Sequence, residues 1–295
     1  MKLTVALRVI GGFGIISLLL LIIGITAYGS LSNISESTAE VNQISIPALE
    51  NSAAMQSEFV IMSKLSLQAF NAASLPEIEQ LRKQFSNEQQ TYQQASERLM
   101  NAVQEEVTLK AAAGEVNQAY SSFIPVSTKL FEELKNNLTL RDTIDNKLSE
   151  LEGHADDMAS LILDFTDVRD VQRRFPHSYQ AATSIETGIN TLISNVVDLN
   201  RTLSDTTANT ISNEIAFRLK ELNDQFAVIK TETADQVSLV AELEDKVSAI
   251  NASLDGSQGI PALKLTRLQS SADATTLLAS AEQQTASGMA SLAGL

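Results

Sequence analysis

The residues best suited to ligand chemistry are polar side chains that interrupt an otherwise apolar helical seam. Over residues 116–165, apolar side chains recur in alternating steps of three and four, and Asn137 and Arg141 occupy positions of that seam. A buried guanidinium without a partner is strongly destabilising. Arg141 must therefore meet an internal carboxylate, reach water or bind an anion. Two interpretations follow: a ligand site at Asn137 and Arg141, or a polar layer that sets the register of a helical bundle.

A matching polar gap lies in a later seam. Apolar residues repeat in the same way over residues 215–254, where Thr233 and Gln236 replace them. Polar groups at core positions are how helical bundles build ligand sites. We therefore expect Thr233 and Gln236 to contribute to ligand binding together with Asn137 and Arg141.

The densest positive patch of the chain is formed by Arg169, Arg173 and Arg174, beside His177. Pro176 follows directly and marks the start of a helix. The arginines and the free N–H groups of that helix N-terminus could bind an anion together. The alternative is a charged loop whose arginines pair with the neighbouring aspartates.

Several other chemistries lack the residues that they need. The chain has no cysteine and only two histidines, His154 and His177, which excludes disulfides, thiolate metal sites and histidine-rich metal sites. No nucleophile elbow, phosphate loop, zinc-protease helix or dinucleotide fingerprint is present. The formal charge of −15 opposes binding to nucleic acid. We therefore predict neither an enzyme nor a protein with a cofactor or metal.

The N-terminal segment predicts a membrane anchor. Residues 9–28 carry no charge, and a helix of that length rises about 30 Å, which matches the hydrocarbon core of a bilayer. Lys2 and Arg8 precede it, so the positive-inside rule places residues 1–8 in the cytoplasm and residues 29–295 on the other side of the membrane. The alternative is a cleaved signal peptide, although its apolar region usually spans only about 7–15 residues.

The rest of the chain predicts an all-α fold. Glycine and proline are scarce, at 12 and 5 residues, and no alternating strand pattern occurs. The first segment should continue directly from the membrane helix. A Ser74–Glu77 capping box and a stop signal at Gly114 help to delimit six long antiparallel helices. Their apolar repeats cover residues 34–69, 78–102, 116–165, 185–203, 215–254 and 261 onward. The sixth would run back towards the bilayer, so we expect the chain to stop before a second membrane helix; the alternative is a single-pass protein with a free C-terminus.

This layout resembles that of bacterial methyl-accepting chemotaxis proteins with a periplasmic sensor domain of the helical bimodular type. It is also similar to the input domains of trimethylamine-oxide-type sensor histidine kinases. The resemblance is carried by the basic start, the membrane helix, the helical heptads and the proline step Ser-Ile-Pro-Ala-Leu-Glu at residues 45–50. The HAMP linker and the cytoplasmic signalling hairpin of such receptors are missing from the sequence.

The resemblance implies two stacked four-helix bundles, a homodimer, and a ligand that is either a small molecule such as a carboxylate or a ligand-loaded binding protein. Binding would shift helices slightly and pass that shift through the membrane helix. The competing hypothesis is a membrane-anchored coiled-coil spacer or adhesion stalk without a ligand. The polar gaps discriminate between the two, because a pure spacer does not need them.

Overall fold

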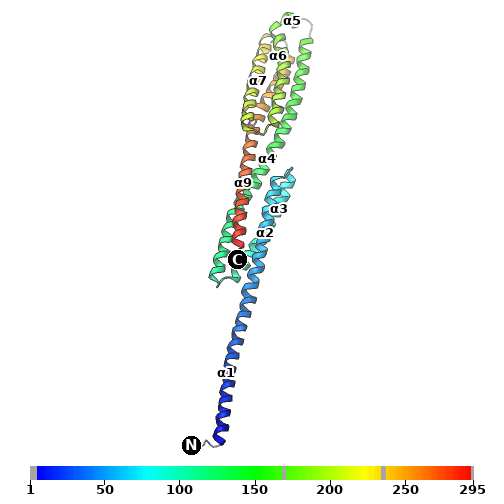
Figure 1. Cartoon of the computed structure of the whole chain (residues 1–295). Coiled ribbons are helices and arrows are strands. Elements are labelled where there is room, and N and C mark those ends of the chain that lie inside the picture. The colour runs from blue at the N-terminus through cyan, green and yellow to red at the C-terminus, as the bar shows by residue number, and fades with distance from the viewer. Residues whose placement is uncertain (1–4, 168–170, 234–236, 294–295) are drawn as a thin grey trace. The chain divides into compact units, whose positions relative to one another are not determined.

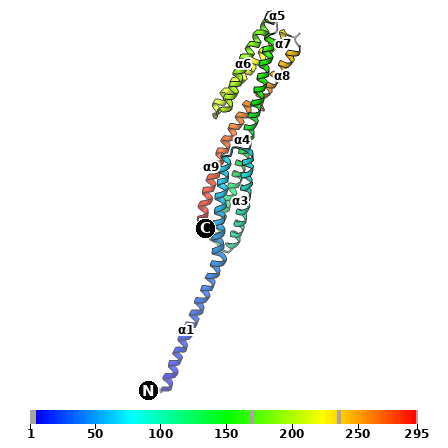
Figure 2. The same ribbon diagram turned by 90° about the vertical axis from the view of Figure 1, so that its right-hand side faces the viewer.

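A computed structural model describes residues 5–167, 171–233 and 237–293. Within these residues the chain forms helices joined by short turns, without any strand (Figures 1 and 2). The sequence accounts for this, because residues that favour helices dominate and the helix breakers glycine and proline are scarce. The all-α prediction is confirmed.

The N-terminal helix is a single rod without a turn. Helix α1 (Val5–Glu40), the π-helix η1 (Val41–Ser45) and α2 (Ile46–Phe70) follow one another directly. Pro47 lacks an N–H group, and its ring would collide with the carbonyl group four residues earlier in a regular α-helix. The wider π turn relieves this collision, and the N–H group of Ile46 bonds to the carbonyl oxygen of Val41, five residues back. The predicted continuation of the first helix is confirmed, and Pro47 does not end it.

Part of this rod is apolar and uncovered. The side chains of Leu18, Leu20 and Ile25 are between 62% and 64% exposed. An 18-residue window of the helix has a mean hydropathy of 1.7, and none of it is buried. The helix is therefore long and apolar enough to cross a membrane, as a retained span or as a signal sequence.

The first of two compact units joins Met1–Lys64, Gln84–Phe123 and Glu282–Leu295. It contains parts of α2, α3 (Leu75–Ala102), α4 (Val107–Asp167) and α9 (Ile260–Leu292). Its core is aromatic: the Phe59 ring lies 4.9 Å from that of Phe123, and Tyr92 stacks on Tyr120 at 3.9 Å between centroids. A Cβ atom at Gly288 of α9 would overlap the Phe59 ring. Only glycine allows the backbone of α9 to approach this ring so closely.

The second unit joins Leu65–Lys83 and Ile124–Ala281. Its apolar core combines α4, α6 (Pro176–Arg201), α7 (Asp205–Glu232), α8 (Val237–Leu254) and the start of α9, and the short helix α5 (Val171–Arg174) leads into α6. Burial follows the apolar seams of the sequence, as the fully covered Ile144, Leu151, Met158, Leu192, Val196 and Ile229 illustrate.

The predicted helix over residues 215–254 is wrong, because the chain reverses within it. Helices α7 and α8 are antiparallel: the side-chain amides of Asn223 and Asn251 exchange two hydrogen bonds of 2.9 and 2.8 Å, and Lys230 pairs with Glu244. The apolar repeat persists through the reversal, since it records which residues are buried and not the direction of the chain. The described chain after α1 therefore has seven long helices where six were predicted.

The stop signal predicted at Gly114 is also wrong. Helix α3 ends at Ala102, and α4 already begins at Val107, so Gly114 lies inside α4. A glycine in a helix interior costs only about 1 kcal/mol. Burial of Ala113 and Val116, both fully covered, outweighs that cost.

Candidate functional site

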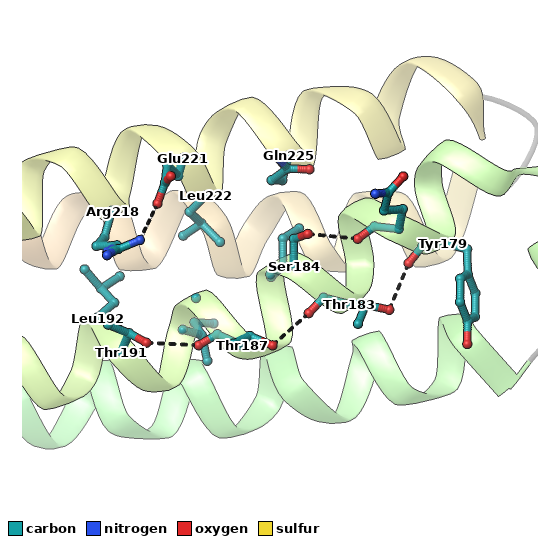
Figure 3. Close-up of a pocket in the computed structure, with 14 residues that line it drawn as sticks. Tyr179, Thr183, Ser184, Thr187, Thr191, Leu192, Arg218, Glu221, Leu222 and Gln225 are labelled. Carbon is teal, nitrogen blue, oxygen red and sulfur yellow. Dashed lines mark hydrogen bonds and ion pairs between the residues drawn. The ribbon is translucent and has the colours of Figure 1, made fainter.

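A groove of about 630 Å³ lies between α6 and α7 in the second unit (Figure 3). Its floor is formed by Ile185, Ile189, Leu192 and Leu222, whose side chains also belong to the core. These residues are buried because they follow the inward stripe of each helix, with spacings of four and three along α6. The groove therefore offers an apolar base that is open to solvent on one side.

One wall carries a row of hydroxyl groups. Thr183, Thr187 and Thr191 are spaced four residues apart on α6, and each hydroxyl donates to the carbonyl oxygen four residues earlier, at 3.1, 3.2 and 3.3 Å. Ser184 does the same towards Gln180 at 3.0 Å. Since each hydroxyl has a single proton, these groups keep only oxygen lone pairs for a ligand. Figure 3 shows these bonds along α6.

A glycine enlarges the groove beside this wall. A Cβ atom at Gly188 would meet no atom within 4 Å. Gly188 is therefore not required by packing in this structure, although glycine weakens a helix by about 1 kcal/mol relative to alanine. Its effect here is to leave open volume next to Thr187 and Ile189.

The other wall carries an arginine between two carboxylates. Arg218 donates from Nε to Glu214 Oε1 at 3.0 Å and from Nη1 to Glu221 Oε2 at 2.9 Å. Its guanidinium carbon also lies 5.5 Å from the centroid of the Phe217 ring. The hydrogen bond that Arg218 donates to Glu221 is the main cause that raises the pKa of Arg218. This triad has two negative charges and one positive charge, so its net charge is negative.

The predicted ligand residues of α4 are held by internal partners. Asn137 Nδ2 donates to the backbone oxygen of Arg267 at 2.9 Å. Arg141 donates from Nε and Nη2 to Asp142 Oδ1 at 3.1 and 2.9 Å, and from Nη1 to the backbone oxygen of Ala73 at 3.0 Å. The sequence allows Arg141 to meet a carboxylate of the chain, water or a bound anion. In the structure its partner is a carboxylate of the chain, that of Asp142. Both side chains connect helices or turns of the second unit.

The polar gap of the later seam is used differently. Thr233 is fully buried directly after α7, and its hydroxyl donates to the carbonyl oxygen of Ile229 at 2.6 Å. Gln236, the other predicted residue, lies outside the described residues. Thr233 follows Glu232, which bonds to Ser178 in the first turn of α6. It is therefore located at the N-terminal end of α6.

Arg141 belongs to the opposite end of α6. Burial, and then the nearby charge of Arg141, lowers the pKa of Arg267. Arg267 is one helical turn from Lys264, whose buried ammonium donates to the carbonyl oxygen of Asn200 at 2.8 Å. Asn200 is the penultimate residue of α6, and the helix is about 36 Å long between its first turn and this residue. The structure thus does not bring Thr233 and Arg141 together in one site.

The predicted anion site at the start of α6 contains the chain's own carboxylate. Glu232 Oε2 accepts from Ser178 N at 2.5 Å and from Ser178 Oγ at 2.7 Å. The hydroxyl of Ser178 is the main cause that lowers the pKa of Glu232. Arg173 and Arg174 lie in α5 and have partners in the chain, among them the Phe175 ring 5.0 Å from Arg174. Arg169 lies outside the described residues.

No cluster of three or more histidine, aspartate or glutamate side chains that could hold a metal occurs among the residues that the structure describes. The groove between α6 and α7 was not predicted from the sequence, because threonine and serine on the outer face of a helix look like an ordinary polar surface. The available signal was the spacing of four between Thr183, Thr187 and Thr191 next to a glycine inside a helix. Comparison with protein-family models, with curated proteins and with solved structures gave no match.

Proposed function

We propose that this chain is the sensory input module of a membrane-anchored bacterial receptor of the chemoreceptor kind. One observation carries the proposal: a helix without a turn extends from the exposed apolar segment of α1 through η1 into the aromatic core around Phe59. A displacement of Phe59 along the helix axis would be transmitted to the apolar segment, because no loop interrupts the helix between them. The π-helix η1 is the one irregular point of the rod and a natural place for a small change of helix direction.

The groove between α6 and α7 would receive the signal. It combines an apolar floor with polar groups from two helices, which is the usual form of a small-molecule site. A ligand that contacts both helices favours the arrangement in which it binds best, and so shifts the population of states. Helices α4 and α9 each contribute residues to both compact units, which supplies covalent continuity between the groove's unit and the rod's unit.

The proposal requires α1 to remain in the inner membrane, with the helices beyond it in the periplasm. Because the chain has no cysteine of its own, a maleimide can label a single-cysteine variant only at the introduced residue. In intact spheroplasts, a membrane-impermeant maleimide should label Ser30→Cys and spare Lys2→Cys. Labelling of both, or of Lys2→Cys alone, would exclude this topology. A mature chain that starts near Ser30 would identify the segment as a cleaved signal peptide.

A second copy of the chain is the proposed partner along α2. Ile46, Leu49 and Val60 are 44%, 70% and 40% exposed, and their separations of 3 and 11 residues fit one coiled-coil stripe. Oxidative cross-linking of Leu49→Cys in proteoliposomes should give a covalent dimer. Glu50→Cys, one residue off the stripe, is the matched control and should cross-link much more slowly. Equal rates would exclude this interface.

The same cross-link tests sensing. A thermal-shift screen of small amines and carboxylates on the full chain identifies binders, and each binder is then added to Leu49→Cys proteoliposomes. A receptor should change its cross-linking rate when a binder is present, and Glu50→Cys should not respond. A molecule that stabilises the fold and leaves the rate unchanged would contradict the sensory role.

The second candidate is a membrane-anchored spacer without a ligand. It is favoured by the internal partners of Asn137 and Arg141, since a polar layer that is satisfied by the chain itself needs no ligand. A spacer predicts that no small molecule raises the midpoint of thermal unfolding. The sensory proposal predicts at least one that does.

A further inference from the structure

We propose that the groove between α6 and α7 selects a small organic cation, an ammonium group on a short aliphatic chain, over a carboxylate. The inference rests on the proposed sensing function and specifies the ligand class of the same groove. It differs from the anionic ligand that the arginines of the sequence suggest, because Arg141, Arg173 and Arg174 do not line this groove and have partners of their own.

The hydrogen-bonding character of the groove favours a ligand that donates. The hydroxyl protons of Thr183, Thr187 and Thr191 are used within α6, so these groups can only accept further hydrogen bonds. An ammonium group has three donors and no acceptor, and it complements such a wall. A carboxylate has only acceptors, and it would face oxygen lone pairs along the row formed by Thr183, Thr187 and Thr191.

The charges of the groove favour the same class. Arg218 is shared between Glu214 and Glu221, and the three groups together have a net negative charge. An anion that approached Arg218 would have to displace one of these carboxylates, which gains no ion pair in total. A cation can instead approach Glu221, which is exposed and keeps lone pairs beyond its bond to Arg218.

The shape of the groove accounts for the aliphatic chain. Figure 3 shows Arg218 and Glu221 near the Thr191 end of the groove and Tyr179 at the other. Between these ends, Ile185 and Ile189 form an apolar floor. An ammonium group beside Glu221 would place its chain along this floor, where each methylene that is covered from water strengthens binding.

The first experiment compares three molecules of equal chain length on the full protein in nanodiscs: butylammonium, butyrate and butanol. Isothermal titration should give a dissociation constant for butylammonium that is at least about tenfold lower than that for butyrate, as expected for one charge-assisted hydrogen bond. Butanol should bind more weakly than butylammonium. Tighter or equal binding of butyrate would overturn the inference, and so would the absence of butylammonium binding at millimolar concentration.

A charge variant tests the role of Glu221. Glu221→Gln should weaken butylammonium about tenfold, since it replaces a charge-assisted hydrogen bond by a neutral one. Glu186→Gln removes the same charge from an exposed position of α6 that does not line the groove. It should leave the affinity within about twofold, as expected for screened surface charges. An equal loss of affinity in both variants would mean that the net charge of the protein alone attracts the cation. It would overturn the assignment of the cation to Glu221.

A filling variant tests the location. Gly188→Leu places a side chain in the open volume of the groove, and Gly153→Leu makes the same change in α4. A Cβ atom meets no neighbour at either position, so both variants should fold and gain helix stability. Only Gly188→Leu should abolish butylammonium binding. Binding that survives in Gly188→Leu would overturn the assignment to this groove.

The results separate the ligand class from the sensing function. If butylammonium binds and the cross-linking rate of Leu49→Cys does not change, the ligand class stands and the sensing function fails. If butyrate is the molecule that binds and changes the rate, sensing stands and the ligand class is overturned.

Discussion

Protonation of a carboxyl pair should control the stability of the first compact unit. Glu58 on α2 and Glu88 on α3 face each other, and Glu58 Oε2 is buried without a hydrogen-bond donor. Two carboxylates can hydrogen-bond only when one of them holds a proton. Burial, and then the neighbouring Glu88, raises the pKa of Glu58 to about 7. The pair therefore holds a proton close to neutral pH.

No cation compensates the pair from the helices that pack around it. The segments that surround Phe59 in the core are residues 51–63, 84–96, 116–128 and 283–293, and Glu58 and Glu88 are the only charged residues in them. The two tyrosines of this layer remain neutral, because burial raises the pKa of Tyr92 and of Tyr120 above 10. Ionisation of both carboxyls would thus leave two uncompensated negative charges at this interface.

The sign of the pH effect follows from proton linkage. The pKa of Glu58 is about 7 in the folded protein and 4.5 in an unfolded chain, so the folded state binds more protons between these values. Stability should then fall as pH rises from 5 to 7.5. A difference of this size corresponds to at most about 3 kcal/mol. Because the side chain is only partly buried, solvent screening should reduce the effect to about 1–2 kcal/mol.

The assay is urea unfolding at pH values from 5 to 8, followed by circular dichroism and by tyrosine fluorescence. Glu88→Gln should flatten the profile and stabilise the protein at pH 8 by about 1 kcal/mol, since the amide donates to Glu58 without a charge. Glu97→Gln, which alters an exposed carboxyl of the same helix, is the control and should keep the slope. Stability that rises with pH in this window, or a slope unchanged in Glu88→Gln, would refute the reasoning.

Three further outcomes are expected elsewhere in the chain. Gly288→Val should destabilise the first unit by about 1–3 kcal/mol, because its side chain would overlap the Phe59 ring, and an unchanged unfolding midpoint would contradict this packing. Arg141→Ala should cost about 1–2 kcal/mol through the lost bond to Ala73 and still fold, as a denaturant titration can show. Glu232→Gln should weaken the start of α6, seen as faster amide exchange there. In the unaltered protein the lowered pKa of Glu232 makes this contribution present above pH 4.5 and lost as pH falls below it.

The predicted ligand residues show why the seam pattern is informative about burial and uninformative about ligands. The apolar repeat predicted seam positions for Asn137, Arg141 and Thr233; Thr233 is fully buried, whereas Asn137 and Arg141 are half-buried. It could not indicate that backbone oxygens of Ala73 and Arg267, remote in sequence, would satisfy the first two. Hydrogen-bond partners across helices depend on axial alignment, which a period of seven residues leaves open.

The groove illustrates the converse case. Thr183 and Thr187 have exposed side chains and match the outer face that the sequence predicts for α6. That they line a groove depends on the position of α7 beside them, and in particular on Arg218, whose charge is neutralised by residues of its own helix. A sequence pattern identifies a helix face, whereas a groove is a property of two helices.

The amino-acid sequence by itself determined the helical class, the exposed apolar N-terminal helix and most of the buried residues. These features follow from short-range periodicity, residue propensity and the absence of strand patterns, all of which are local. Only the tertiary structure decided that the chain reverses between α7 and α8, that Gly114 lies within a helix, and that Glu232 fills the start of α6. Those outcomes depend on which surfaces pack together, because the free energy of burial is shared between segments that are distant in the sequence.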